Sequence, residues 1–166
     1  AGSDTLTIVS NDRGNSGDFD GDGTPGETLQ DARTDTDTVA ITVSPVNDAP
    51  AGTDKTVNIG EDDTEYTFSS ADFGFTDPND SPANAFQSVI ITTLPPETEG
   101  TLLLNDTPVT EGQTIPVAQI VNLVFQPALD VNGSGVGAFT FQVVDNGGTA
   151  NGGEDTDASP NTFAFN

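Results

Sequence analysis

The sequence contains no cysteine, histidine, methionine or tryptophan. Without cysteine it has no disulfide framework, no thiolate zinc site and no thiol nucleophile. Without histidine it has no Ser-His-Asp triad, and the usual protein ligand of transition metals is missing. Carboxylate pairs occur throughout so acidic a chain, so they do not single out a glycosidase site. We therefore expect no enzymatic activity.

Positive charge is also scarce. Arg13, Arg33 and Lys55 are the only basic residues beside 27 acidic ones, and the net charge is −24. Binding to nucleic acid needs Lys and Arg to contact the phosphates, so we expect no nucleic-acid partner. An anionic membrane surface would repel this chain. The given residues show no signal-peptide pattern and no apolar run long enough to cross a membrane, so we expect no direct membrane insertion by them. The remaining metal donors are oxygen atoms, which suit calcium.

The apolar residues come in short segments that are rich in β-branched and aromatic side chains, separated by Gly, Pro, Asn and Asp. Several segments alternate, as where Phe139, Phe141 and Val143 would face one side of a strand. Only 116–123 has the pattern of a single helical turn. These features predict an all-β fold, an antiparallel sandwich. The predicted strands are 5–9, 38–43, 56–59, 65–69, 87–94, 101–104, 123–126, 138–144 and 162–165.

The same order of sequence elements occurs twice in the chain. A strand is followed by an Asp-x-Gly turn, a long Gly/Asp-rich loop, an Asp-Thr-Asp element and a closing strand. In this alignment Asp12 corresponds to Asp145. The Asp-Thr-Asp aspartates Asp35 and Asp37 correspond to Asp155 and Asp157.

The repeat predicts tandem modules. Residues 1–46 would be the C-terminal strands, with a long acidic loop, of a preceding or split module, 47–52 a linker, and 53–166 a second module. A lone hairpin is marginally stable in water, so the first segment must dock. It could pack on the second module, swap between chains, or complete a sandwich whose other strands come from elsewhere. Because the pattern starts and stops within strands, we expect the chain to be an excerpt of a longer protein.

The linker PVNDAP at 45–50 and the segment EGTLLLNDTPVTEGQTIPVAQIVNLVFQPALDVNGSGVGAFTFQVVDNGG at 99–148 resemble the cadherin-like repeats of large bacterial RTX-type surface adhesins. The resemblance implies an extracellular, Ig/cadherin-like β-sandwich stiffened by calcium-binding loops. The chain lacks the GGxGxDxUx repeats of RTX secretion regions. Its long loop at 14–34 also differs from that of a plain spacer.

An acidic loop at 17–28 offers a first metal site. Asp18, Asp20 and Asp22 occupy alternate positions and a glycine follows, as in the first half of an EF-hand loop. A tightly turning backbone points such carboxylates at one centre. The second half does not match, because a leucine stands where the bidentate glutamate belongs. The alternative is a solvated acidic turn. Substitute ligands would be Thr24 (through its carbonyl), Glu27 and Asp31.

The resemblance implies a second calcium site at the linker. Cadherins hold calcium between modules with the linker Asn-Asp, a Glu of the next module and an Asp-x-Asp element. Pro45 stands where cadherins carry another acid, so one ligand is missing. The alternative is a rigid, proline-bounded turn without an ion. The matching residues are Asn47, Asp48, Glu61, Asp77 and Asp80, with Asn79, Asp62 and Asp63 beside them.

Asp12 and Asp145 each stand in an Asp-x-Gly turn and could join a metal site with the downstream Asp-Thr-Asp. The alternative is a turn aspartate that accepts hydrogen bonds from its own backbone.

Together these patterns lead us to expect a calcium-binding module of a bacterial adhesin. It would act at the cell surface as a calcium-rigidified extender or tip, with neighbouring repeats of the same polypeptide as partners. The alternative is a calcium-dependent module that binds a peptide or a carbohydrate.

Overall fold

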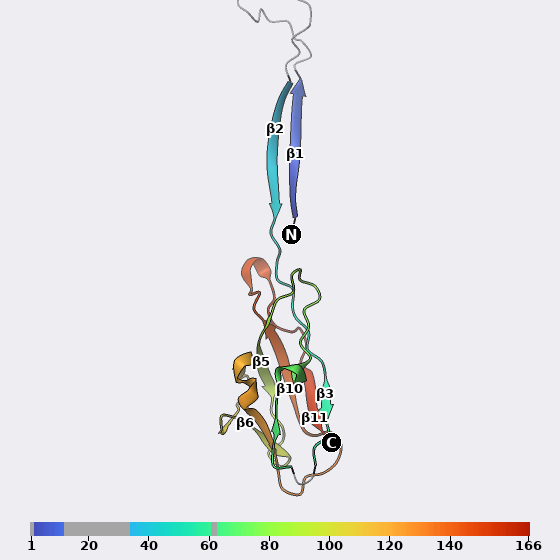
Figure 1. Cartoon of the computed structure of the whole chain (residues 1–166), viewed down its shortest axis with the longest axis vertical. Coiled ribbons are helices and arrows are strands. Elements are labelled where there is room, and N and C mark those ends of the chain that lie inside the picture. Colours follow the sequence, from blue (N-terminus) through green and yellow to red (C-terminus); the bar gives the residue numbers. More distant parts are fainter. Residues whose placement is uncertain (1, 12–33, 61–62) are drawn as a thin grey trace, which may run out of the picture. The chain divides into compact units, whose positions relative to one another are not determined.

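The computed structural model describes residues 2–11, 34–60 and 63–166. The chain divides into two compact units, which we call unit 1 (Ala1–Pro45) and unit 2 (Val46–Asn166). Unit 1 contains two antiparallel strands, β1 (Gly2–Asn11) and β2 (Thr34–Val43). Strands are the main regular secondary structure of both units (Figure 1), so the predicted all-β class is confirmed.

One face of the β1–β2 hairpin carries most of its large apolar side chains, together with Asp4 and Asp37. Paired residues of an antiparallel ladder share a face, so the pairing of Leu6 with Val39 places both on the face that also carries Ile8 and Ile41. Leu6 and Val39 are 52% and 49% exposed within the described structure. The other face is mainly Ser and Thr. A hairpin with this much apolar exposure gains little from burial.

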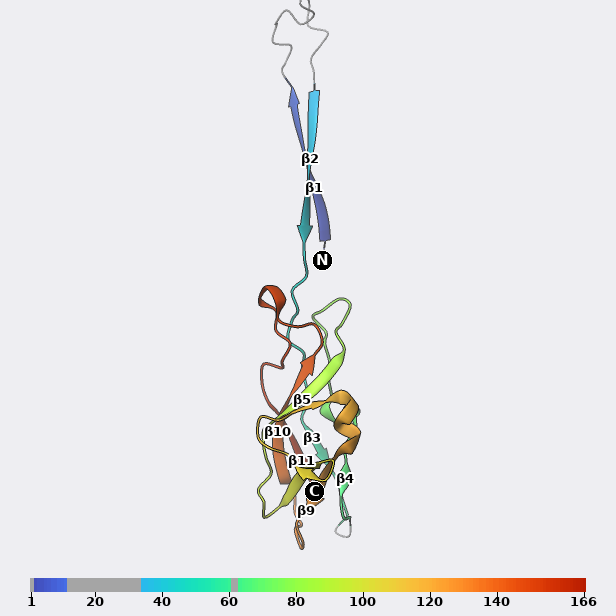
Figure 2. The same cartoon turned by 90° about the vertical axis from the view of Figure 1, so that its left-hand side faces the viewer.

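Unit 2 contains two sheets, one of five strands in the order β3-β11-β10-β5-β8 and one of four in the order β4-β9-β6-β7 (Figure 2). Within the described residues all its strand pairs are antiparallel except β3 with β11. The strands are β3 (Lys55–Val57), β4 (Tyr66–Thr67), β5 (Phe86–Thr93), β6 (Gly100–Leu104), β7 (Thr107–Pro108), β8 (Thr114–Pro116), β9 (Leu123–Pro127), β10 (Val136–Asp145) and β11 (Asn161–Phe165). Three short 3-10 helices are η1 (Ser70–Phe73), η2 (Val117–Asn122) and η3 (Ala150–Gly152).

One hydrophobic core joins the two sheets. Its centre is aromatic: the rings of Phe125 on β9 and Phe165 on β11 stack across the sheets with centroids 4.2 Å apart. Gly100 and Gly137, both at positive φ, lie so close to the Phe125 ring that a Cβ at either position would clash with it. The fully buried phenylalanines are Phe68, Phe73, Phe125, Phe139, Phe141, Phe163 and Phe165. The sandwich therefore rests on large side chains supplied by the alternating strands.

Each of the nine predicted strands has a counterpart, and the predicted helical turn is η2. Phe139, Phe141 and Val143 are buried as their alternation predicts. Sequence reasoning missed β7 and β8. They are two and three residues long and each contains a proline, so neither shows the alternation that marks a strand.

The two hairpins share a register over three residue pairs, before the β10–β11 pairing shifts between Val136 and Phe139. Leu6 pairs with Val39 in unit 1, and Phe139 pairs with Phe163 in unit 2. Aligning these pairs sets TVAI at 38–41 on TFAF at 162–165. In this frame Asp37 lies within β2, opposite Ile8, whereas Asp157 precedes β11. The expected correspondence of the two Asp-Thr-Asp elements is therefore wrong, because it offsets the closing strands.

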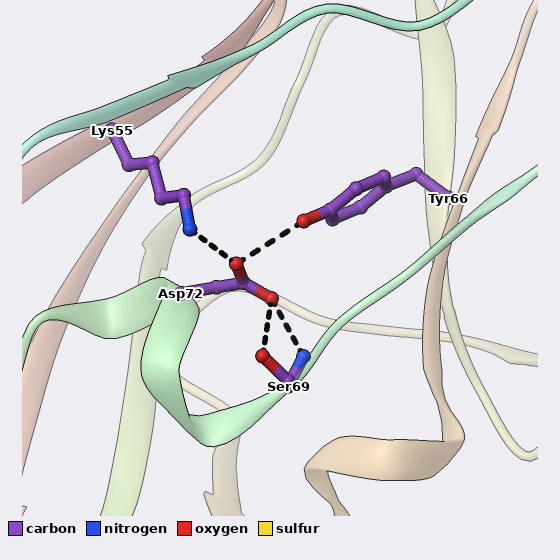
Figure 3. A network of polar contacts seen from close by, with 4 residues as sticks. All are labelled: Lys55, Tyr66, Ser69 and Asp72. Atoms are coloured by element: carbon purple, nitrogen blue, oxygen red, sulfur yellow. Dashed lines mark hydrogen bonds and ion pairs between the residues drawn. The ribbon is translucent and has the colours of Figure 1, made fainter.

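A polar network ties β3, β4 and η1 together (Figure 3). Lys55 Nζ lies 2.5 Å from Asp72 Oδ1, and the Tyr66 hydroxyl donates to the same oxygen at 3.1 Å. Ser69 donates to Asp72 Oδ2 from its backbone N–H and its hydroxyl, at 2.7 and 2.9 Å. Burial alone would raise the pKa of Asp72, but the Lys55 and Ser69 donors outweigh it and hold the pKa below its usual value. The charged carboxylate thus caps η1.

Candidate metal site at the Asn47 end of unit 2

Three segments far apart in the sequence meet where the chain enters unit 2: residues 47–48, residues 77–84 before β5, and the turn that follows β10 at Asp145. Figures 1 and 2 show these loops at the same end of the sandwich. The β5–β10 pairing places them there, since Asp145 pairs with Phe86 at that end of the sheet. The two strands thus carry their adjoining loops to one edge.

Asn47 links the linker to the turn after β10. Its Nδ2 donates to Asp145 Oδ1 at 3.0 Å, to Asp145 Oδ2 at 3.3 Å and to the carbonyl of Glu154 at 2.7 Å. The backbone carbonyl of Asn47 accepts a hydrogen bond from the Glu154 N–H at 3.0 Å. Asp145 is fully buried and also accepts the Gly147 N–H at 2.8 Å. Asp145 is thus a turn aspartate that also binds a distant side chain.

Asn84 joins the second group of acids to the first. Its Nδ2 donates to Asn47 Oδ1 and, at 3.3 Å, to Asp80 Oδ2. Its backbone N–H donates to Asp77 Oδ2. Asp80 Oδ2 also accepts the Asp48 N–H at 2.9 Å. Three carboxylates and two carboxamides therefore form one continuous network.

The Asp77 carboxylate is only half satisfied. Its residue is 7% exposed, and Oδ1 is buried without a hydrogen-bond partner in the structure. Leaving a buried acceptor unpaired costs about 1–3 kcal/mol, and more for a charged group. A negative oxygen held in this position, beside a network that contains two further carboxylates, calls for a positive partner.

Two glycines leave room around Asn47. A Cβ on Gly147 would overlap Asn47 Oδ1, and one on Gly153 would lie 3.0 Å from Asn47 Cβ. Gly147 belongs to the sequence DNGG and Gly153 to NGGE. The small residues of these turns are thus required for Asn47 to reach Asp145.

The donor set is all oxygen, which fits calcium. Within the described ranges, however, no three acidic side chains are gathered closely enough to hold an ion as placed. The amide nitrogens of Asn47 and Asn84 face the carboxylates instead. Turning either amide would present its Oδ1 in place of the nitrogen.

The structure brings together five residues that the sequence indicated: Asn47, Asp48, Asp77, Asp80 and Asp145. Asn79 is exposed, and Asp63 lies beyond the far end of β3, where its carboxylate accepts the Gly60 N–H at 2.6 Å. The following predicted residues lie outside the described ranges: Asp12, Asp18, Asp20, Asp22, Thr24, Glu27, Asp31, Glu61 and Asp62.

Asp157, a candidate from the Asp-Thr-Asp element, has its oxygens filled by protein donors. Oδ2 accepts the Gly52 N–H at 2.8 Å and Asn161 Nδ2 at 2.6 Å, and Oδ1 accepts the Ser159 N–H at 3.1 Å. Asn84, by contrast, was not anticipated. A single asparagine before a strand carries no motif, and only the fold shows that it joins Asn47 to Asp80.

Comparisons of the chain with protein-family models, with curated proteins and with solved structures gave no match. In the described part of the chain, no helix has the length and apolar character needed to span a membrane.

Proposed function

We propose that unit 2 is a calcium-stabilised β-sandwich module of Ig/cadherin-like type, and that it acts as an extender in a bacterial cell-surface adhesin. The observation that carries the calcium assignment is the buried, unpartnered Oδ1 of Asp77 within a network of oxygen donors. The adhesin assignment rests on the resemblance of PVNDAP and of 99–148 to cadherin-like repeats. Neighbouring modules of the same polypeptide are the proposed partners.

Calcium would be held by the carboxylates of Asp77, Asp80 and Asp145 and by Asn47 Oδ1. Bound there, the ion supplies the positive charge that these carboxylates lack. It ties the linker to the loops on either side of the β5–β10 pair. A ligand present at 100 times its dissociation constant stabilises the folded state by about 2.7 kcal/mol. That gain is a large part of a typical domain stability of about 5–15 kcal/mol.

The shared register of the two hairpins supports the tandem arrangement. Leu6 and Val39 occupy the positions of Phe139 and Phe163, which are fully buried in unit 2. We propose that β1 and β2 are the closing hairpin of another module of this kind, with their apolar face toward that module's core.

The test is calcium titration by calorimetry on the metal-stripped full chain, with melting curves in calcium and in chelator. Asp77→Asn should remove one bound ion and most of the calcium-induced rise in melting temperature. The matched control Glu97→Gln removes an exposed carboxylate outside the network and should leave both unchanged. Asp20→Asn with Asp22→Asn tests the acidic loop separately. A melting temperature of Asp77→Asn that responds to calcium as fully as the parent would overturn this site.

A further inference from the structure

The first and last strands of unit 2 lie side by side and run in the same direction. β3 pairs with β11 in parallel register, Lys55 opposite Phe163 and Val57 opposite Phe165. The chain enters β3 from the Asn47 end of the sandwich and leaves β11 at the opposite end, where Asn166 lies (Figures 1 and 2). Tension between Val46 and Asn166 therefore pulls these two neighbouring strands in opposite directions along their length.

Hydrogen bonds continue this pairing beyond both ends of β3. Toward the exit, Asn166 N–H donates to the Val57 carbonyl at 2.9 Å and Ile59 N–H donates to the Asn166 carbonyl at 3.1 Å. Toward the entry, Thr162 N–H donates to Asp54 Oδ1 at 2.7 Å. Further toward the entry, Gly52 N–H donates to Asp157 Oδ2 at 2.8 Å. We call this row of bonds, from Gly52 to Ile59, the β3–β11 seam.

β11 is fixed more firmly than β3. It lies between β3 and β10, and its side chains Phe163 and Phe165 are fully buried in the core. β3 is the edge strand of the five-stranded sheet and pairs within that sheet with β11 alone. On its other side Lys55 binds Asp72 of η1, and the backbone at 51–53 exchanges hydrogen bonds with that at 73–76. The seam is therefore the sheet contact that must break before the entering chain can separate from β11.

We propose that the β3–β11 seam is a mechanical clamp, and that unit 2 bears tension applied between its two ends. Force along two parallel strands loads all the bonds of the seam together, so that they must break in one step. Force that pulls both strands from the same end breaks them one after another at lower load. Forced unfolding follows the barrier to unfolding, not the equilibrium stability, so this resistance depends on the direction of pulling. The inference rests on strand order and goes beyond the proposed calcium site.

Single-molecule pulling on the full chain tests the clamp, because the absence of cysteine allows two handles to be placed at will. Val46→Cys with Asn166→Cys loads the seam in shear. Val46→Cys with Ser159→Cys pulls on the entry side of both strands and peels them apart. Each pair is measured at one loading rate, in calcium and in chelator. We expect an unfolding force several times higher in shear than in peeling, under both conditions.

Equal forces in the two geometries would overturn the clamp. A large force difference in calcium that disappears in chelator would also overturn it, because the resistance to unfolding would then come from the metal site. If the chain binds no calcium but the force in shear still exceeds the force in peeling, the calcium proposal alone is rejected.

Side-chain variants locate the resistance. Asp54→Ala removes the acceptor of the Thr162 N–H and should lower the shear force. Gln113→Ala is the matched control: it removes a side-chain acceptor that binds the Thr110 N–H at 2.9 Å, away from the seam. Equal losses of shear force in the two variants would contradict the assignment.

Discussion

Lys55 and Asp72, which belong to β3 and η1, form an ion pair with 2.5 Å between Nζ and Oδ1, and Tyr66 donates a hydrogen bond to the same oxygen. Asp72 is 6% exposed, so its removal leaves several donors without a partner. We expect Asp72→Ala to lower the free energy of unfolding by about 2–3 kcal/mol, measured in urea. Asp72→Asn should cost less, because it keeps an acceptor. The exposed Glu65→Ala should lie within about 0.5 kcal/mol of the parent. An Asp72→Ala variant as stable as Glu65→Ala would contradict this role.

Tyr66 makes stability depend on alkaline pH. Burial, the negative charge of Asp72 and the hydrogen bond to it together raise the pKa of Tyr66 to about 12. The unfolded chain loses the phenol proton near pH 10, where the folded state still holds it. The contribution of Tyr66 to stability is therefore complete below pH 10 and is lost as the pH rises toward 12.

The measurement is unfolding free energy against pH for the parent and for Tyr66→Phe. The parent should lose stability more steeply between pH 10 and 12. As the sequence has one tyrosine and no tryptophan, phenolate absorbance reports this residue alone. A phenol that titrates near pH 10 in the folded protein would refute the prediction.

Gly147 tests the packing around Asn47. A Cβ there would overlap Asn47 Oδ1 and would lie 2.5 Å from Asn84 Nδ2. We expect Gly147→Ala to destabilise unit 2 by about 1–3 kcal/mol and to suppress the calcium-induced rise in melting temperature. Gly148→Ala is the control. It adds backbone strain at φ 77° but its Cβ meets nothing within 4 Å, so the calcium response should persist. Equal calcium responses would show that Asn47 is not part of the site.

The stacked pair Phe125 and Phe165 joins the two sheets. We expect Phe165→Ala to lower the free energy of unfolding by about 3–5 kcal/mol, because a large cavity would open in the core. Leu129→Ala provides the surface control, since Leu129 is 96% exposed, and should change stability by less than about 0.5 kcal/mol. Chemical denaturation followed by far-ultraviolet circular dichroism measures both. A loss below 1 kcal/mol at Phe165 would mean that the sheets are held together elsewhere.

The hairpin of unit 1 should behave differently from unit 2 in hydrogen exchange. In the 166-residue chain we expect the β1 and β2 amides to exchange with little protection, whereas those of β10 and β11 should be strongly protected. Mass spectrometry of peptic fragments measures this at two protein concentrations. Protection of β1 that rises with concentration would show that a second copy covers its apolar face.

The parts of the fold that could be predicted from sequence are those in which a strand alternates over several residues. β10 is the best case, because Phe139, Phe141 and Val143 all point into the core. β8 was missed because three residues that include a proline carry no period. The same limit applies to the Lys55–Asp72 pair. Nothing local to either residue indicates the other, and their contact exists only because η1 packs beside β3.

For the candidate site, residue chemistry was predictable but connectivity was not. The linker resemblance indicated Asn47 and Asp77, and the Asp-x-Gly turn indicated Asp145. The bridging role of Asn84 follows from the β5–β10 pairing, which brings residue 84 beside the turn at Gly147. Asp157 shows the converse. Its acidic motif suggested a metal ligand, yet donors from Gly52, Ser159 and Asn161 fill its oxygens, as a purely structural aspartate requires.

If unit 2 is one of several tandem modules, as proposed, the separation of its entry and exit has a consequence for how the protein changes over generations. Because Asn47 and Asn166 lie at opposite ends of the sandwich, a gene duplication that copies the unit in frame starts each new copy where the previous one stops. Every duplication or deletion then alters reach by one unit while the internal contacts of each copy remain intact. Recombination between near-identical copies would be an inexpensive source of variants that differ only in length.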